Sequence, residues 1–243
     1  MRQLRIGTFN IQHSQPRQPG VTARAALETL CAELSALELD YIALQEVDAG
    51  LERSGNLDQP RLIAAALQMG WQFCPTLPGY GVAAFTRLPS ESWCGRPLPI
   101  KKERGNFGNW FARSPEPRVW LGTRLALGNG EQLLLANTHL SVQVPLARAQ
   151  LTWLTSQLAQ MAGEGRPVIL LGDLNLPPQA VAEAAPHWTA LASGNTVPMP
   201  TPNRQIDHIL GWNLAAANAE NLGKNVQKLS VSDHAGLIAE IEI

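Results

Sequence analysis

Six short apolar runs in the sequence end in, or contain, a carboxylate, an amide or an imidazole. The polar residues concerned are Asn10, Glu46, His139, Asp173 with Asn175, Asp207, and Asp233 with His234. Each run has the length and the β-branched or leucine content of a buried strand. Open α/β sheets carry their chemistry at strand ends and in the loops that follow. Acids, amides and histidines without a suitable cysteine or serine predict a hydrolase that holds a hard metal ion and attacks phosphorus.

The overall composition is compatible with such an enzyme. The 243 residues show no linker, so we expect one domain over residues 1–243, and the 45% of hydrophobic residues can bury a sizeable core. The net charge of -1 and the pI of about 6.5 exclude a global basic field for nucleic acid. The three cysteines lack metal-ligand spacing and predict free or buried thiols in a reducing compartment. Because no signal-peptide core and no bilayer-spanning segment is visible, we expect a cytoplasmic protein.

Helical and strand patterns alternate along the chain. Periodic apolar residues predict helices near residues 22–37, 60–69 and 145–161, with strands between and after them. The Gly128-Asn129-Gly130 sequence is typical of a hairpin turn, here between strands at 119–125 and 132–137. This mixed order favours two packed sheets with helices outside. Residues 90–117 lack periodicity and predict a long functional loop.

An ordered set of motifs spans nearly the whole chain. The motifs are TFNIQ (8–12), LQEVD (44–48), RSGNLDQ (53–59), NTHLS (137–141), ARAQ (147–150), GDLN (172–175), QIDHI (205–209) and SDH (232–234). With them the chain resembles the DNase I-like endonuclease/exonuclease/phosphatase superfamily, most closely its short bacterial members of unassigned substrate. The resemblance implies an α/β fold, a four-layer αββα sandwich of two mixed β-sheets flanked by helices, with a divalent-metal site at one end that hydrolyses phosphate esters.

Two departures from the superfamily pattern bear on the substrate. The Glu46 motif continues as Val47-Asp48, where AP endonucleases usually carry Thr-Lys, and this argues against abasic-site repair. Val82 stands where the superfamily often has an asparagine, so a hydrogen-bonding group near the phosphate is expected to be missing. The acid, amide and histidine positions are intact, so these changes concern the substrate class more than the chemistry.

The candidate metal and phosphate ligands come from five sequence segments. Glu46 is the first candidate metal ligand, because a hard carboxylate oxygen suits Mg²⁺ or Mn²⁺. The resemblance implies that Asn10 assists the metal or a phosphate oxygen, and that Asp233 touches a second metal position or a metal-bound water. Arg53 in RSGNLDQ and Arg118 in EPRVW are candidate phosphate-binding residues.

The candidate catalytic residues follow from the same resemblance. Asp173 and Asn175 would point to the same side of an extended segment, although a turn at Asp173 is the alternative. By resemblance, Asp173 orients or deprotonates the attacking water, and Asn175 donates to a phosphate oxygen. Asp207 would fix the tautomer of His234, which acts as general base or phosphate ligand. His139 is the candidate general acid or transition-state stabiliser.

The other polar residues near these motifs are expected to be structural. His13 follows the first motif and is expected at the surface, with lining of the cleft as the alternative. His208 occupies the position after a site residue on a strand, so it faces the opposite side and is expected to pack. His187 lies in a predicted loop and is expected at the surface. Arg148 and Gln150 are expected to organise their loop and not to react.

The segment 96–113 interleaves basic and aromatic residues. This pattern suits a nucleic-acid backbone with stacked bases, and equally a membrane interface or an ordinary packed loop. We expect a phosphodiesterase that acts on nucleic acid. The alternatives are a phospholipid or sphingomyelin-type phosphodiesterase, an inositol-phosphate phosphatase, and a binding protein on the same fold with weakened catalysis. No obligate protein partner is evident.

Overall fold

Two six-stranded β-sheets form the centre of the computed structural model, which describes residues 3–100, 116–128, 130–214 and 225–243. The first sheet has the order β11-β12-β1-β2-β4-β3, with β1 (Gln3–Asn10), β2 (Tyr41–Asp48), β3 (Gly70–Leu77), β4 (Tyr80–Thr86), β11 (Val226–Lys228) and β12 (Ala235–Glu242). The second has the order β5-β6-β7-β8-β10-β9, with β5 (Ser90–Cys94), β6 (Trp120–Gly128), β7 (Glu131–His139), β8 (Val168–Asp173), β9 (Thr189–Ala190) and β10 (Asp207–Trp212). Both sheets are mixed, because β1–β2 and β7–β8 pair in parallel while their neighbours pair antiparallel.

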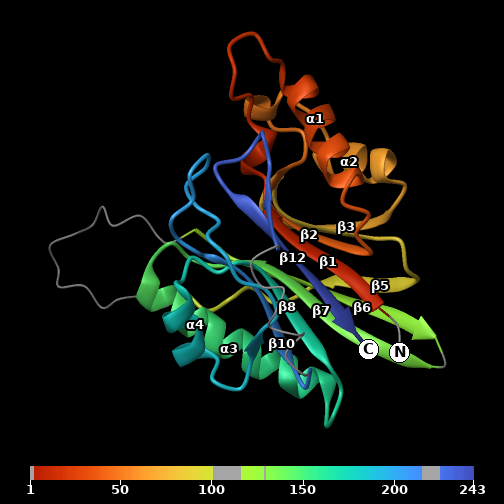
Figure 1. Cartoon of the computed structure of the whole chain (residues 1–243), viewed down its shortest axis with the longest axis vertical. Coiled ribbons are helices and arrows are strands. Elements are labelled where there is room, and N and C mark those ends of the chain that lie inside the picture. Colours follow the sequence, from red (N-terminus) through yellow and green to blue (C-terminus); the bar gives the residue numbers. More distant parts are fainter. Residues whose placement is uncertain (1–2, 101–115, 129, 215–224) are drawn as a thin grey trace, which may run out of the picture.

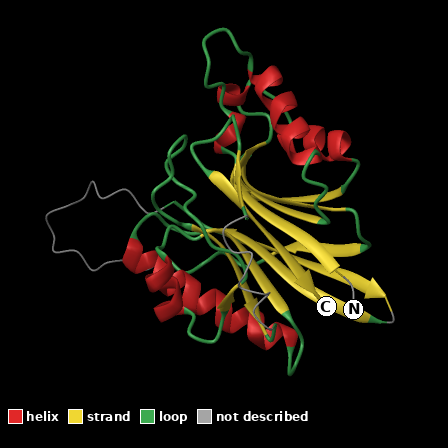
Figure 2. Cartoon of the chain, viewed as in Figure 1, coloured by secondary structure: helices red, strands yellow, loops and turns green. Residues whose placement is uncertain are grey.

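Helices cover the outer face of each sheet. α1 (Ala23–Ser35) and α2 (Gln59–Leu67) lie over the first sheet, and α3 (Val144–Ala162) and α4 (Pro178–Ala184) lie over the second (Figure 1). Two 3-10 turns, η1 (Gln12–Ser14) and η2 (Glu52–Ser54), follow β1 and β2. The layers are helix, sheet, sheet and helix, which confirms the predicted αββα sandwich (Figure 2). No helix within the described ranges is long and apolar enough to cross a bilayer.

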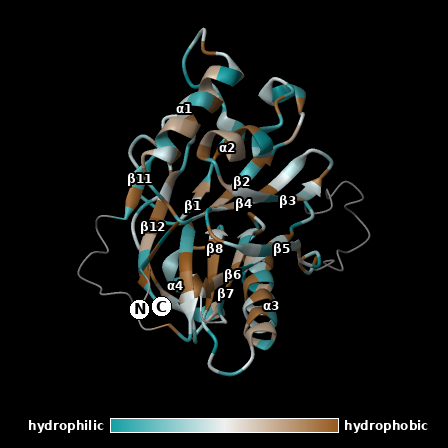
Figure 3. Ribbon diagram, turned by 90° about the vertical axis from the view of Figure 1, so that its right-hand side faces the viewer, coloured by the Kyte–Doolittle hydropathy of each residue, from teal (hydrophilic) through white to brown (hydrophobic). Residues whose placement is uncertain are grey.

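Three layers of apolar side chains hold the sandwich together. Leu135 and Ile169 belong to the layer between the sheets. Leu30 and Ile63 pack the first helix pair onto its sheet, and Leu154 belongs to the corresponding layer under α3. The hydrophobic residues accordingly gather on the central strands, and the helices alternate between hydrophobic and hydrophilic residues (Figure 3). These positions are the ones that the strand and helix patterns predict to be buried.

Local sequence signals explain where the first two helices begin. The Thr22 hydroxyl accepts a hydrogen bond from the Ala25 backbone at 3.2 Å, and the Asp58 carboxylate accepts one from the Arg61 backbone at 3.2 Å. Both are N-cap interactions that satisfy an unpaired helix donor. The prediction of a continuous loop over 90–117 is wrong at its start, because β5 pairs there with β6. This edge strand is short and has no buried face to impose an alternating pattern.

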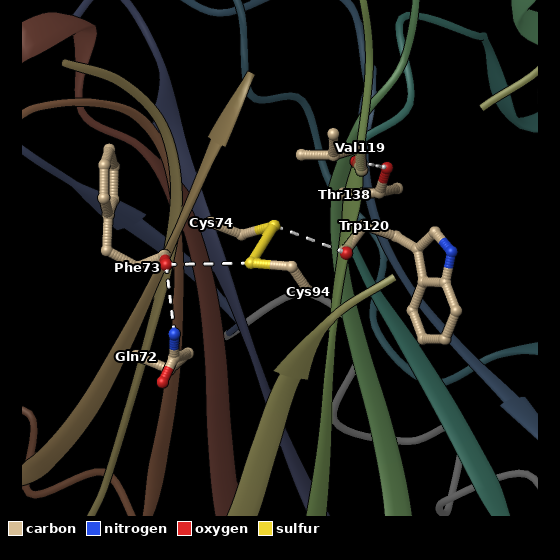
Figure 4. The surroundings of a disulfide bond; sticks show 7 residues. All are labelled: Gln72, Phe73, Cys74, Cys94, Val119, Trp120 and Thr138. Carbon is tan, nitrogen blue, oxygen red and sulfur yellow. Dashed lines mark hydrogen bonds between the residues drawn. A yellow bond between two sulfur atoms is a disulfide. The ribbon is translucent and has the colours of Figure 1, made fainter. Parts of the chain in front are cut away.

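A disulfide joins Cys74 in β3 to Cys94 in β5, with Cα atoms 5.4 Å apart (Figure 4). β3 and β5 are edge strands of different sheets, so the bond links the two sheets along one side. The prediction of three free or buried thiols is therefore wrong for two cysteines and confirmed for Cys31, which is free and buried. The strands meet only in the folded chain, so sequence spacing does not reveal the pair. Cysteine usage consequently no longer indicates a reducing compartment.

A buried polar network crosses from one sheet to the other near the strand ends. Gln45 donates through its amide nitrogen to Thr8 Oγ1 at 3.0 Å and to Asn137 Oδ1 at 2.7 Å. The Asn137 amide donates in turn to the backbone oxygens of Leu44 at 2.9 Å and Ala83 at 2.8 Å. The three polar side chains are fully buried. Because the three bonds of Asn137 join β7 of the second sheet to β2 and β4 of the first, the network fixes how the sheets are aligned.

Candidate active site

Strand register places three of the predicted residues side by side at one end of the second sheet. His139 ends β7 and is the Cα partner of Asp173, which ends β8. Asp207 opens the antiparallel strand β10 and is also a Cα partner of Asp173. All three side chains are buried, and His139 Nε2 lies 3.4 Å from Asp173 Oδ2.

The first sheet contributes Asn10, at the end of β1. Its amide nitrogen donates to Glu46 Oε1 and to Asp173 Oδ2, each at 3.0 Å, so one side chain connects acids of both sheets. Its oxygen accepts from the Gln12 backbone N–H at 3.1 Å. The amide nitrogen, not the oxygen, therefore faces the carboxylates. As placed, Asn10 links the two acids, and its role toward a metal or a phosphate oxygen stays a prediction.

Glu46 lies in a bulge of β2. The register between β2 and β4 shifts between Leu44 and Val47, and Glu46 has a φ of +55°. Residues other than glycine rarely adopt this left-handed conformation, which is strained and is found most often at functional sites. A bulge redirects a side chain out of the regular alternation of the strand. The Glu46 side chain remains 23% exposed and lines a pocket.

Asp207 and His234 form the dyad expected from the sequence. His234 Nδ1 lies 2.9 Å from Asp207 Oδ2, and His234 Nε2 lies 3.9 Å from Asp173 Oδ2. The second carboxylate oxygen of Asp207 is buried and has no hydrogen-bond partner in the described part of the chain. The imidazole thus lies between two buried carboxyl groups, with its Nε2 atom on the Asp173 side.

The loop before β12 holds His234 in place. The Ser232 hydroxyl donates to the Asn10 backbone oxygen at 2.6 Å and accepts from the His234 backbone N–H at 3.0 Å. The serine of the SDH motif therefore ties this loop to the end of β1. Asp233 stands between Ser232 and His234 in the sequence, and its side chain is 44% exposed. Its carboxylate accepts a hydrogen bond from Gln12 Nε2 at 3.1 Å. Asp233 is placed at the rim, and it is not among the buried acids.

Burial and neighbouring charges set the protonation of the site. Burial, then the charge of Asp207, raises the pKa of Asp173 to about 7. Burial alone would lower the pKa of His234, but the charge and hydrogen bond of Asp207 raise it to about 9. Burial, followed by the Arg118 cation, holds the pKa of His139 well below its usual value. A protonated His234 and a neutral His139 therefore flank Asp173 near neutral pH.

Asn175 reaches the site through a turn and not on an extended segment. Its φ is +51°, and its backbone N–H donates to Asp173 Oδ1 at 3.0 Å. Its amide nitrogen donates to the Leu140 backbone oxygen at 3.0 Å. The prediction that the two residues share one side of an extended strand is wrong, because the Asp173 side chain forms the alternative turn. The same turn keeps Asn175 next to the buried acid.

Arg53 is engaged by a buried carboxylate. Its Nε and Nη2 atoms donate to the two oxygens of Asp48 at 2.8 and 2.7 Å. Burial alone would raise the pKa of Asp48, but the hydrogen bonds from Arg53 and then His13 lower it to about 2. The guanidinium also lies 5.0 Å over the ring of Tyr80. Two of its five N–H donors are therefore occupied, and its predicted phosphate contact is left to Nη1 and to the second N–H of Nη2.

Arg118 is a buried cation near the second-sheet cluster. Its side chain is 6% exposed, and Nη2 lies 3.4 Å from Glu116. Its Nε atom has no hydrogen-bond partner among the described residues. Its charge contributes to the low pKa of His139, which places the two side chains close enough to interact electrostatically. A buried donor without a partner is compatible with the predicted phosphate-binding role.

His13 takes the position that the sequence left as its alternative, in the lining of the cleft. Its ring lies 3.4 Å from Glu46 Oε2 and 3.4 Å from Asp48 Oδ1, and its side chain is 17% exposed. Gln59 accepts from the Asp48 backbone at 2.9 Å and donates to the His13 backbone oxygen. The expectation of a surface histidine is wrong, because η1 turns in the left-handed sense and folds His13 back over β2. The one available signal was its position three residues after Asn10.

A pocket of about 570 Å³ adjoins Glu46. Its lining residues are His13, Glu46, Leu51, Glu52, Arg53, Leu77, Pro78, Tyr80 and Glu116. The lining combines three carboxylates with one guanidinium, and it includes an apolar side made by two leucines and a proline. The pocket is therefore suited to part of a ligand next to Glu46, outside the buried cluster around Asp173.

The donor set fits a divalent cation. Among the described residues, Asp173, Asp207 and His234 have polar atoms within 4.8 Å of one another, and the two carboxylates of this group offer oxygen ligands while His234 is paired with Asp207. Glu46 adds a partly exposed carboxylate linked to this cluster through Asn10. The buried Asp207 oxygen without a hydrogen-bond partner is a further acceptor. Carboxylate oxygens are the ligands that Mg²⁺ and Mn²⁺ prefer.

Comparison with known proteins identifies the family. The family model described as "Endonuclease/Exonuclease/phosphatase family" matches residues 7–234. The chain belongs to this family. Its members are divalent-metal-dependent phosphoesterases, and the superfamily resemblance deduced from the motifs is confirmed. No curated protein sequence matches the chain.

Solved structures of this family have the same fold. An endonuclease/exonuclease/phosphatase from Beutenbergia cavernae is 22% identical, with a TM-score of 0.66 over 100% of this chain and 72% of that one. Truncated TDP2 from Caenorhabditis elegans is 15% identical, with a TM-score of 0.69 over 99% and 98%. The mannosyl-6-phosphatase Bt3783 from Bacteroides thetaiotaomicron is 13% identical, with a TM-score of 0.71 over 99% and 100%. These similarities concern the fold.

Most of the remaining predictions outside the core of the site can be compared with the structure. His208 is buried, with Nε2 2.8 Å from the Leu176 backbone oxygen, and His187 is exposed, as expected. Gln150 accepts from the Ser141 backbone at 2.9 Å, which confirms its organising role, and Arg148 pairs with a glutamate of α4. Val82, at the family's frequent asparagine position, packs in the core between the sheets. Most of the basic and aromatic segment 96–113 lies outside the described residues.

Proposed function

We propose that the chain is a Mg²⁺- or Mn²⁺-dependent phosphodiesterase. The observation that carries this proposal is the convergence of Asp173, Asp207, His234 and His139 at one end of the sandwich, joined to Glu46 by the Asn10 amide. The site combines carboxylates fixed by hydrogen bonds with one protonated and one neutral imidazole. Such a set of groups suits the attack of water on phosphorus.

Each residue has a role that follows from its surroundings. Glu46 would hold the divalent metal ion, which neutralises phosphate charge and lowers the pKa of bound water. Asp173, with a pKa near 7, is suited to accept a proton from the attacking water. His234 is charged by its contact with Asp207 and is therefore suited to bind a phosphate oxygen more than to act as a base. His139 is neutral, so it is suited to donate one hydrogen bond to the transition state.

The substrate class is proposed from two regions of the chain. Nucleic acid is the first candidate, because the segment 96–113 alternates cations with aromatic residues. A small phosphate ester is the second candidate, and the pocket beside Glu46 favours it. The three glutamates that line this open pocket repel a long polyanion, whereas a compact neutral group can lie beside them.

The direct test is a hydrolysis screen with Mg²⁺ or Mn²⁺, with and without EDTA. The substrates are bis-p-nitrophenyl phosphate, p-nitrophenyl phosphate, plasmid DNA, single-stranded RNA, sphingomyelin and inositol phosphates. We expect EDTA-sensitive hydrolysis of the diester. Glu46→Gln keeps the shape of the side chain and removes its charge, so it should lower turnover by at least about 100-fold.

A matched control is available on the surface. Glu28→Gln makes the same substitution on the exposed side of α1 and should leave turnover unchanged. Equal EDTA-sensitive activity in the Glu46 and Glu28 variants would reject the metal-ligand role of Glu46. Absence of hydrolysis in the whole screen would instead support a binding protein on this fold.

A further inference from the structure

The His13 imidazole faces the Glu46 carboxylate from the pocket side. His13 Nε2 lies 3.4 Å from Glu46 Oε2, while the other carboxylate oxygen, Oε1, accepts the Asn10 amide at 3.0 Å. Asn10 therefore occupies one oxygen of Glu46 and leaves Oε2 for the imidazole side. Both His13 and Glu46 line the pocket of about 570 Å³, so the space between them is reached from solvent.

The surroundings of the ring decide which nitrogen carries the hydrogen. Nδ1 lies 3.2 Å from the Glu46 backbone oxygen and 3.4 Å from Asp48 Oδ1. Both of these atoms are acceptors, so they favour a hydrogen on Nδ1. In the neutral ring, Nε2 then presents its lone pair to Glu46 Oε2. A carboxylate behind an imidazole is the arrangement that orients many metal-binding histidines in proteins.

Two acceptors that face each other need a hydrogen or a cation between them, and 3.4 Å is long for an N–H···O hydrogen bond. Ligands that lie about 2.1 Å from a shared cation are separated by about 3.0–3.4 Å. The separation of 3.4 Å between His13 Nε2 and Glu46 Oε2 falls in this range. The backbone also holds the pair in an unfavourable conformation, since φ is +57° at His13 and +55° at Glu46. Such strain persists where the surrounding structure requires it, and it is concentrated at functional sites.

We propose that His13 is a ligand of the divalent cation held by Glu46, so that the site contains one imidazole nitrogen beside its oxygens. This inference rests on the proposed function, because it concerns the same cation. Mg²⁺ prefers an all-oxygen set, whereas imidazole favours the first-row transition metals. The chain should therefore select Mn²⁺ or Co²⁺ over Mg²⁺, and His13 should be the residue that makes the difference.

Pulsed electron paramagnetic resonance of Mn²⁺ added to the full chain tests the proposal. Nitrogen-14 modulation in the electron spin echo reports an imidazole bound directly to Mn²⁺. We expect this modulation in the wild type, its loss in His13→Asn, and its retention in His139→Asn and His234→Asn. Asparagine suits position 13, because it tolerates a positive φ better than most residues. Circular dichroism should show that the variants fold.

Equilibrium dialysis gives a second measurement on the same proteins. His13→Asn should weaken Mn²⁺ binding by about tenfold or more and Mg²⁺ binding much less. Bound Mn²⁺ without nitrogen modulation in the wild type, or with modulation that survives in His13→Asn, would overturn the inference and leave the proposed function standing. If the wild type bound neither metal, the proposed function would fail together with the inference.

Discussion

At the scale of single residues, the properties of His234 depend on its contact with Asp207. Their 2.9 Å contact is buried, and the raised pKa of His234 depends on the charge of Asp207. Removal of Asp207 therefore removes both the orientation and the charge of the imidazole. The two residues constitute one functional unit, which has a kinetic consequence.

We predict that the Ala variants of this pair are not additive. Asp207→Ala and His234→Ala should each lower kcat by a similar factor, and the double variant should lose little more, because residues that act as a unit are removed together. Steady-state hydrolysis of bis-p-nitrophenyl phosphate with Mn²⁺ measures the three values. Losses that multiply would show that Asp207 and His234 have independent roles.

Arg53 and Asp48 provide a stability prediction. Asp48 is fully buried and receives two hydrogen bonds from Arg53, so Arg53→Ala leaves a buried carboxylate partly unpaired. The free energy of unfolding should fall by at least about 2 kcal/mol. Arg148→Ala removes an arginine from an ion pair whose two partners are both exposed, and it should change this quantity by less than about 1 kcal/mol. Urea unfolding measures the free energy of unfolding of both variants. Equal losses in the two variants would contradict the prediction.

Strand register explains the site at the scale of elements. His139, Asp173 and Asp207 come from three successive strands of the second sheet. Asp173 lies on the middle strand and is the Cα partner of each of the other two. Asn10 and Glu46 come from paired strands of the first sheet. The side chains packed between the two sheets must keep the sheets aligned so that these residues meet. The buried Gln45–Asn137 network is the polar part of that layer.

We predict that Asn137→Ala strongly destabilises the fold. The change leaves the Leu44 and Ala83 backbone oxygens and the Gln45 amide without their partner in a buried layer. The expected loss is about 2–4 kcal/mol in the free energy of unfolding. Gln160→Ala removes an amide from the exposed side of α3 and serves as the control, with a change within about 0.5 kcal/mol. A loss as small as that of the control would show that water replaces the missing bonds.

The sequence predicted the elements better than their contacts. Apolar periodicity located α1, α2 and α3, and the motifs identified Asp173, Asp207 and His234, because both signals are local. Register is not local, so the inward turn of His13 and the meeting of β3 with β5 could not be read from spacing. The left-handed conformations at Glu46 and Asn175 also depend on the surrounding packing, and no residue type in the sequence requires them.

At the scale of the whole molecule, the two sheets are linked by one kind of interaction near the site and by another at the β3 and β5 edges. Near the site, Asn10 and the Gln45 network connect them by hydrogen bonds. At the β3 and β5 edges they are joined covalently by Cys74 and Cys94. Only Cys74 is buried among the residues of these two edge strands, so little other buried packing from them holds this border together.

We predict that reduction of the disulfide lowers the thermal stability of the whole sandwich. Closure of a loop of 20 residues contributes about 3 kcal/mol in the chain-entropy description. The melting temperature should therefore fall by several degrees in dithiothreitol, and Cys74→Ser with Cys94→Ser should melt at the lower temperature with or without the reductant.

Thiol titration checks the premise of this prediction in the same samples. Burial, then the charge of Glu28, raises the pKa of Cys31 to about 11, so the one free thiol should not react in the native protein at pH 8. Unfolding without reductant should expose one thiol, and unfolding after reduction should expose three, the total number of cysteines. Three thiols before reduction would mean that Cys74 and Cys94 are not joined, and the melting temperature would then not respond to dithiothreitol.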